Sequence, residues 1–117
     1  KQKESGSTMT RTFVYTAPFR RCWKMMGLGD DVLPRLEEVL LQNPQLGDVI
    51  EGTGGARKMR IALGGRGKSG GARVIYVDVL EREHLYLLFA YPKNVQENLT
   101  AEQKKMLRKI TEEIRKE

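Results

Sequence analysis

Three apolar runs near the middle of the chain constrain its fold more than any other feature. They span residues 58–63, 73–80 and 84–91. Apolar and polar side chains alternate in the first run, as in a strand with one buried face, and the second is nearly continuous in apolar character, which suits a central strand. A glycine-rich loop, residues 64–72, and a charged turn, residues 81–83, join the runs. Because successive strands with short connections usually pair, the sequence predicts a three-strand antiparallel meander.

The rest of the chain predicts one more strand and three helices. Residues 11–16 are β-branched and aromatic, which indicates a strand. Apolar side chains then recur at helical spacing in three segments. We expect Thr16 to cap the first helix, Asp30 or Asp31 to cap the second, and Thr100 to open the third in a capping box.

The whole pattern predicts a single α+β domain. The expected order is β-α-α-β-β-β-α, with residues 45–55 as a loop. The N-terminal strand and the meander would form a small antiparallel sheet, with flanking helices covering one face. A chain of 117 residues that is 39% apolar can bury one modest core. Residues 1–9 are polar and patternless, so we interpret them as a flexible tail or expression remnant and place the domain at residues 10–117.

Positive charge concentrates in residues 52–78. The formal net charge of the chain is +6, and this stretch contains no acidic residue before Asp78. A fixed group of cations without neighbouring acids favours a polyanion such as nucleic acid over an ordinary solvated surface, which is the alternative. The basic residues of the stretch are Arg57, Lys58, Arg60, Arg66, Lys68 and Arg73.

The chain lacks the residues that several classes of enzyme need. One His and one Cys, together with scattered Asp and Glu, argue against a His-pair nuclease, a zinc site and a two-metal carboxylate nuclease, so we expect neither metal nor cofactor. The glycine-rich loop is not a phosphate-binding P-loop, because Ala62 stands where the motif needs its first glycine. Unpaired Cys22 favours a cytoplasmic protein, and no apolar run is long enough to span a membrane.

After these exclusions, one kind of chemistry suits the basic residues: the cleavage of a phosphodiester with the help of cations. RNA can be cut without a metal when its 2′-OH attacks the adjacent phosphorus, provided that cations stabilise the charge and other groups move the protons. Arginine can hold two phosphate oxygens, and lysine can act as a base. Tyr91, close to Lys93, could orient the hydroxyl or donate a proton, or it could simply pack in the core. Arg73 could equally pair with Asp78 or Glu51.

Several spaced segments resemble one family. The motif NPQLGDVI at residues 43–50 is followed by GTGGARK at 52–58, GKSGGARVIY at 67–76 and LLFAYPKNVQENLTAEQK at 87–104. In this order they resemble the HigB branch of the RelE/ParE toxin superfamily, over most of the chain from Thr12 to Ile114.

The resemblance implies a toxin of a bacterial type II toxin–antitoxin system. Such toxins enter the ribosomal A site, against the rRNA, and cut the mRNA there. A cognate antitoxin, in this branch usually a helix-turn-helix DNA-binding protein, holds them inactive. The resemblance also implies a RelE-like fold. The expected catalytic residues are Lys58, Arg60, Arg73, Tyr91 and Lys93, and those expected to bind RNA or the ribosome are Arg57, Arg66 and Lys68.

The chain departs from the family pattern at two positions, and two other functions are alternatives to the ribonuclease. Pro92 stands where many relatives carry a small residue, and no tyrosine follows Tyr91 to match the C-terminal tyrosine of the best-known RelE toxin. A ParE-type toxin would bind DNA gyrase without catalytic cations, and a basic module could bind nucleic acid without cutting it. The ribonuclease is favoured by the set of cations at Lys58, Arg60, Arg73 and Lys93.

Overall fold

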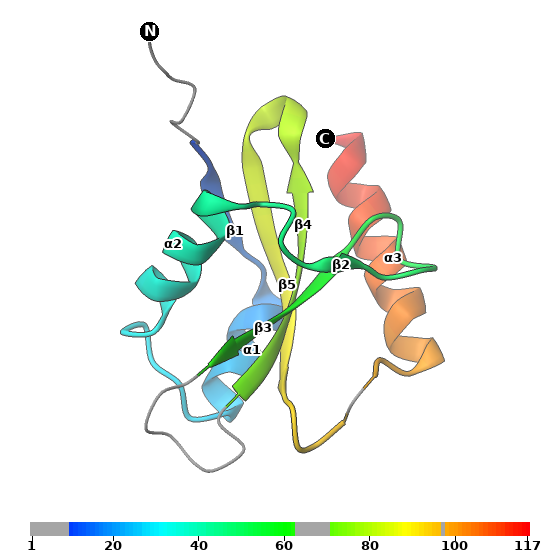
Figure 1. Cartoon of the computed structure of the whole chain (residues 1–117). Helices are drawn as coiled ribbons and strands as arrows, with labels where there is room; N and C mark the ends of the chain where they lie inside the picture. The colour runs from blue at the N-terminus through cyan, green and yellow to red at the C-terminus, as the bar shows by residue number, and fades with distance from the viewer. Residues whose placement is uncertain (1–9, 63–70, 97) are drawn as a thin grey trace, which may run out of the picture.

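A five-stranded sheet forms the centre of the computed structural model, which describes residues 10–62, 71–96 and 98–117. The strands lie in the order β1-β5-β4-β3-β2. Three helices flank the sheet (Figure 1). The strands are β1 (Thr12–Tyr15), β2 (Asp48–Val49), β3 (Arg57–Ala62), β4 (Gly71–Val79) and β5 (His84–Pro92), and the helices are α1 (Ala17–Met25), α2 (Leu33–Gln42), α3 (Ala101–Lys116) and the short 3-10 helix η1 (Leu80–Arg82).

The antiparallel meander of β3, β4 and β5 is confirmed. In β3, Met59 and Ile61 are buried whereas Arg60 and Ala62 are exposed, as the alternation predicts. Most of β4 and β5 is buried, because these two strands lie at the centre of the sheet. The α+β class and the order of the elements therefore follow the sequence pattern.

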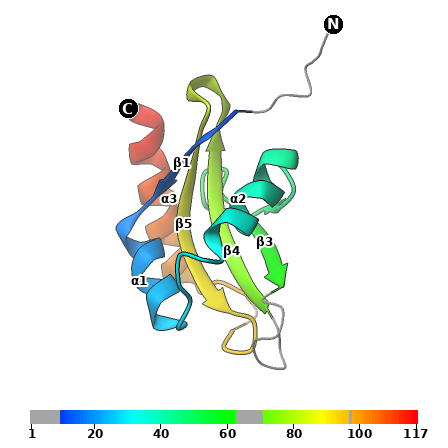
Figure 2. The ribbon, with the colours of Figure 1, turned by 90° about the vertical axis from the view of Figure 1, so that its left-hand side faces the viewer.

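Helices cover both faces of the sheet, so the expectation that they cover one face is wrong. Figures 1 and 2 show α1 and α2 on one side of the strands and α3 on the other. Phe19 and Leu36 of α1 and α2 belong to one apolar core, and Leu107 of α3 belongs to a second core across the sheet. The physical reason lies in β4 and β5, which are apolar on both faces and need cover on both.

Two further corrections concern the edges of the sheet. β1 pairs with β5 in parallel, not antiparallel, with Thr12 opposite His84. A parallel pair needs a long connection, which the rest of the chain supplies between these strands. The expected loop at residues 45–55 contains β2, which pairs with β3. Gly47 allows this close approach, since a Cβ there would lie 2.7 Å from the Lys58 carbonyl oxygen.

The helix caps are confirmed at two of the three expected positions. The Thr16 hydroxyl accepts from the Phe19 amide at the start of α1. Thr100 and Gln103 form the capping box of α3. The cap of α2 is different: Val32 is the N-cap, and its apolar side chain makes no hydrogen bond, while the backbone carbonyl of Asp30 accepts the Leu33 amide. Among the described residues, no helix combines the length and apolar character needed to span a membrane.

Candidate active site

Three of the predicted catalytic residues form a row across the sheet. Arg60 of β3 lies directly opposite Arg73 of β4, which in turn lies opposite Tyr91 of β5. Side chains at such paired positions have Cβ atoms about 4.5–5.5 Å apart. Their strand neighbours face the core under α1 and α2, so Arg60, Arg73 and Tyr91 share the face that carries α3. We call these three residues the cross-strand row.

The row lies where the apolar core under α3 gives way to polar side chains. Along β4, Val77 and Ile75 on this face are fully buried, and the next residue on the same face is the half-buried Arg73. Phe89 packs against Tyr91 with its ring centroid 5.8 Å away. Because central strands hold the backbone, the guanidinium and the phenol have fixed directions.

Two polar atoms of the row are buried without a hydrogen-bond partner among the described residues. They are Nε of Arg73 and the hydroxyl oxygen of Tyr91. Tyr91 is only 3% exposed. An unpaired buried donor costs about 1–3 kcal/mol, so folded proteins rarely keep one without a use for it. Both atoms can donate to a ligand that enters the row.

The ionisation of Tyr91 favours proton donation. Burial raises the pKa of the Tyr91 phenol above its ordinary value of 10.0, and the nearby charge of Arg73 opposes this only in part. The hydroxyl is therefore protonated at neutral pH. It can orient a substrate oxygen or give up a proton to a leaving group, but it is a poor base.

Two lysines flank the row. Lys58 precedes Arg60 by two residues on the same face of β3, and its ammonium donates to Oδ1 of Asn98 over 3.4 Å. The Lys93 amide donates to the Gly71 carbonyl over 3.3 Å, which holds this residue beside the start of β4. Its side chain is exposed. Four cations thus surround one end of the sheet.

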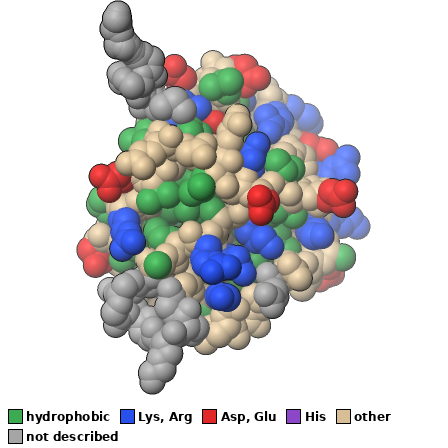
Figure 3. Space-filling model, in the orientation of Figure 1, with side chains coloured by type: hydrophobic (Ala, Val, Ile, Leu, Met, Phe, Trp, Pro, Cys, Tyr) green, Lys and Arg blue, Asp and Glu red, His purple; other side chains and the backbone are tan. Residues whose placement is uncertain are grey.

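No carboxylate among the described residues pairs with Arg60, Arg73 or Lys93. Asp78, a possible partner for Arg73, instead accepts from Arg11 at 2.6 and 2.9 Å. Figure 3 shows Lys and Arg side chains gathered over the lower middle of the molecule, whereas basic and acidic side chains mix towards α3. The row therefore keeps a positive charge that suits a phosphate.

Three predicted residues remain, Arg57, Arg66 and Lys68. Arg57 faces the core under α2, where its guanidinium donates to the carbonyls of Gly47 at 2.7 Å and Gln45 at 3.4 Å. The structure does not bring it to the cross-strand row. Arg66 and Lys68 fall outside the described residues. Sequence reasoning missed Asn98 and Lys104, which line a hollow beside Lys58. Their position around the Thr100 cap was the available signal.

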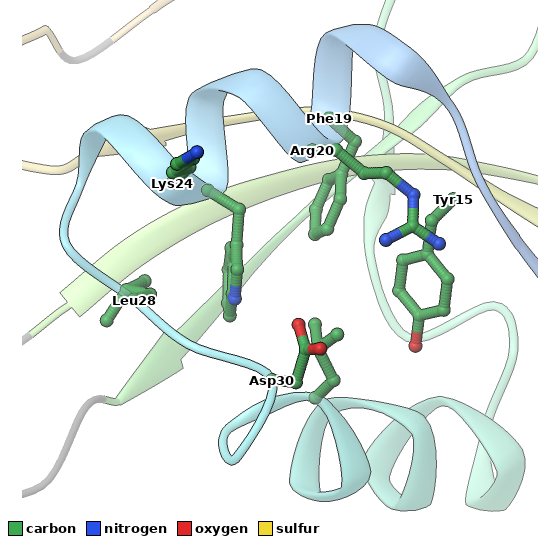
Figure 4. Close-up of a pocket in the computed structure, with 8 residues that line it drawn as sticks. Tyr15, Phe19, Arg20, Lys24, Leu28 and Asp30 are labelled. Atoms are coloured by element: carbon green, nitrogen blue, oxygen red, sulfur yellow. The ribbon is translucent and has the colours of Figure 1, made fainter.

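A second hollow, on the opposite face, has less to offer a ligand. It lies between α1 and α2 and has a volume of about 210 Å³ (Figure 4). Two of its polar side chains bond within the protein: the indole of Trp23 donates to the Gly29 carbonyl over 3.0 Å, and the Tyr15 hydroxyl donates to Glu37. Arg20 lies over the Tyr15 ring, 5.3 Å from its centroid. The cross-strand row, with its unpaired donors, is the better candidate site.

The chemistry open to the row is the binding and activation of a phosphodiester. Its guanidinium groups can hold phosphate oxygens in pairs, and its phenol can donate a proton. Among the residues that the structure describes, no three His, Cys, Asp or Glu side chains gather as metal ligands.

Comparison with known proteins gives a consistent result. A family model described as the RelE toxin of the RelE/RelB toxin–antitoxin system matches residues 10–117. A solved structure of a free E. coli RelE toxin, with two arginines replaced by alanine, has a TM-score of 0.50 and 18% sequence identity, covering 76% of this chain and 90% of that one. The intact E. coli RelBE toxin–antitoxin complex matches with a TM-score of 0.49 and 17% identity, over 70% and 95% of the two chains. The first likeness is one of fold.

Proposed function

The chain belongs to the RelE toxin family of type II toxin–antitoxin systems, and on that premise we propose that it is a ribosome-dependent endoribonuclease that cuts mRNA. The observation that carries the proposal is the pair of unpartnered donors in the cross-strand row, Arg73 Nε and the Tyr91 hydroxyl. They lie on adjacent strands beside Arg60, with no neutralising carboxylate among the described residues. A scissile phosphate would give both donors a partner.

The proposed reaction is an internal transfer within the RNA. The 2′-oxygen attacks the adjacent phosphorus while the bond from phosphorus to the 5′-oxygen breaks. Arg60 and Arg73 hold the non-bridging oxygens as negative charge develops on them, which is the largest contribution expected of the protein. Lys58 must first lose a proton to solvent, and its free amine then accepts the 2′-OH proton, while Tyr91 protonates the leaving 5′-oxygen. The products are a 2′,3′-cyclic phosphate and a 5′-OH end.

The other basic residues of the proposal help to bind the polyanion, either directly or by supporting the fold beside it. Lys93, expected as a catalytic residue, is exposed beside the start of β4 and would help the two arginines to hold the phosphate at the cut bond. Arg66 and Lys68, in the glycine-rich sequence after β3, would contact rRNA or mRNA. Arg57 would act indirectly, because its bonds to the Gly47 and Gln45 carbonyls hold the segment before β2.

Two partners complete the proposal. The toxin would act in the A site of cytoplasmic ribosomes, against mRNA and rRNA, and a cognate antitoxin would hold it inactive. We propose that this antitoxin is a helix-turn-helix DNA-binding protein. Co-purification with the product of the neighbouring gene, followed by a DNA-binding assay, tests this directly.

Mapping of mRNA ends on translating ribosomes tests the proposed function. We expect new 5′-OH ends inside codons in the A site, and none when the same mRNA is presented without ribosomes. The Arg73→Ala variant should leave the mRNA intact, whereas Arg35→Ala should cut as the parent does, since Arg35 is an exposed arginine on α2. Intact mRNA together with inhibited DNA gyrase would overturn the proposal in favour of a gyrase poison.

A further inference from the structure

Asn98 lies between β5 and α3, and its side chain makes a hydrogen bond to Lys58. The Lys58 ammonium donates to Oδ1 of Asn98 over 3.4 Å. Lys58 is half-buried, and none of the described carboxylates forms an ion pair with it. A neutral amide oxygen is therefore the described partner of the amine that serves as the base in the proposed reaction. The other charged side chains around this pair are those of Asp48, Glu51 and Lys104.

The first turn of α3 holds the backbone of Asn98. The Gln96 side chain donates through Nε2 to the Asn98 carbonyl and to Oε1 of Gln103, both over 2.9 Å. The same Gln103 oxygen accepts the Thr100 amide in the capping box. The next residue along the chain, Leu99, is only 8% exposed and belongs to the core under α3. The amide of Asn98 thus extends from a held backbone, although the residue itself is exposed.

An amide oxygen suits a lysine that must act as a base. Once Lys58 has lost a proton, its amine still has two hydrogens, so it can donate one to Asn98 while its lone pair is directed at a substrate hydroxyl. A carboxylate in this place would favour the charged ammonium, and a neutral amide does so less. Hydrogen bonds of catalytic groups are often long without substrate and shorten in the complex, which agrees with the distance of 3.4 Å.

We propose that Asn98 is a positioning residue that directs the Lys58 amine towards the 2′-OH of the RNA, and that Gln96 acts through Asn98. The inference rests on the proposed function. A lysine side chain without a partner has many rotamers and would lose that freedom in each reaction. The bond to Asn98 restricts the rotamers before the substrate arrives, which brings the amine closer to a reactive geometry.

The Asn98→Asp variant tests the contact by adding one charge beside Lys58. An anion at hydrogen-bond distance should favour the ammonium, so Lys58 should lose its proton about one pH unit higher, or more. NMR of labelled lysine side chains measures this titration in the protein alone. In single-turnover cleavage on programmed ribosomes, the rate should level off at a correspondingly higher pH. The matched control, Asn43→Asp, adds the same charge beyond α2, keeps the acceptor for the Gln45 amide, and should move neither curve.

Removal of the amide tests the positioning itself. Asn98→Ala should retain the fold, because the side chain is exposed, and should slow cleavage by about tenfold or more. Gln96→Ala should slow cleavage by less. Because Gln96 is expected to act through Asn98, the double variant should be no slower than Asn98→Ala.

Two results would overturn the inference. An unmoved Lys58 titration in Asn98→Asp would show that the two side chains are not in contact, whether or not the protein cuts RNA. Cleavage by Asn98→Ala and Asn98→Asp at the parent rate and with the parent pH profile would remove Asn98 from the reaction while leaving the proposed function in place.

Discussion

Tyr86 and Tyr91 lie on the same strand and the same face, but their hydroxyl groups have different surroundings. The Tyr86 hydroxyl donates to Glu117 over 3.2 Å near the end of α3. The Tyr91 hydroxyl has no partner within the described part of the chain. A hydroxyl that stabilises the fold and one that serves a ligand should respond differently to removal. The pair therefore offers an internal control.

Replacing Tyr91 with Phe should separate stability from activity. Because the hydroxyl is buried and unpaired, its loss should leave the free energy of unfolding unchanged or raise it by up to about 1 kcal/mol. Loss of the proton donor should slow cleavage on ribosomes by about a hundredfold. Tyr86→Phe should show the opposite, with a loss of about 1 kcal/mol of stability and unaltered cleavage. Denaturant unfolding and end mapping check both, and a Tyr91→Phe protein that cuts normally would refute the assigned role.

At this scale the sequence indicated part of the site. The sequence predicted which residue types form the cross-strand row. It also predicted that Lys58 and Arg60 lie on the face opposite Met59. The same alternation puts Arg57 on the apolar face with Met59, a consequence that counting charges alone overlooked. The sequence could not predict that Arg73 lies opposite Tyr91. This pairing depends on the register of β4 against β5, which has an irregularity between Ile75 and Tyr76.

Among the elements, β1 was predicted as a strand, but its direction was not. Its β-branched and aromatic residues predicted a strand, but nothing in them distinguishes parallel from antiparallel pairing. The sequence did not predict the two-residue β2, because this strand is defined by its pairing with β3 and not by a pattern of apolar and polar residues. The capping box of α3 was readable because its signal is local.

The ion pair of Arg11 and Asp78 should fasten β1 to the end of β4. Their side chains are only 5% and 7% exposed. Removing one partner strands a buried charge, so Arg11→Ala and Asp78→Ala should each cost about 3 kcal/mol, and the double variant should cost less than their sum. Arg108→Ala, which breaks an exposed pair with Glu112, should cost under about 0.5 kcal/mol. Additive losses in a denaturant double-mutant cycle would show that the pair does not hold β1.

For the whole molecule, the tyrosines predict how stability depends on alkaline pH. Burial raises the pKa of Tyr15, Tyr76, Tyr86 and Tyr91 above 10.0, the value expected in the unfolded chain. The folded protein therefore holds more protons than the unfolded chain once the pH passes 10.0. By linkage, this stability is fully present below pH 10.0 and is lost as the pH rises through the folded pKa values.

Denaturant unfolding at a series of pH values, with phenolate absorbance read in parallel, checks this expectation. Phenolate should form in the native protein only above the pH at which it forms in the denatured chain, and the free energy of unfolding should fall over the same range. Tyrosines that ionise at pH 10.0 in the native protein, without loss of stability, would show that their hydroxyl groups are not buried.

In the proposed reaction, Arg73 stabilises the charge that develops on the phosphate as it is cut. Single-turnover cleavage on programmed ribosomes measures this step most directly. Losing one such donor costs about a hundred- to a thousandfold in rate, so Arg73→Ala should cut that much more slowly while its fold and antitoxin binding remain. Arg73→Lys should restore only part of the rate, because a point charge cannot hold two oxygens.

Arg35→Ala, the exposed control on α2, should cut at the parent rate. We expect a wide gap in rate between the two alanine variants in this one measurement. A folded Arg73→Ala protein that cuts within a few fold of the parent would contradict it and remove Arg73 from the mechanism.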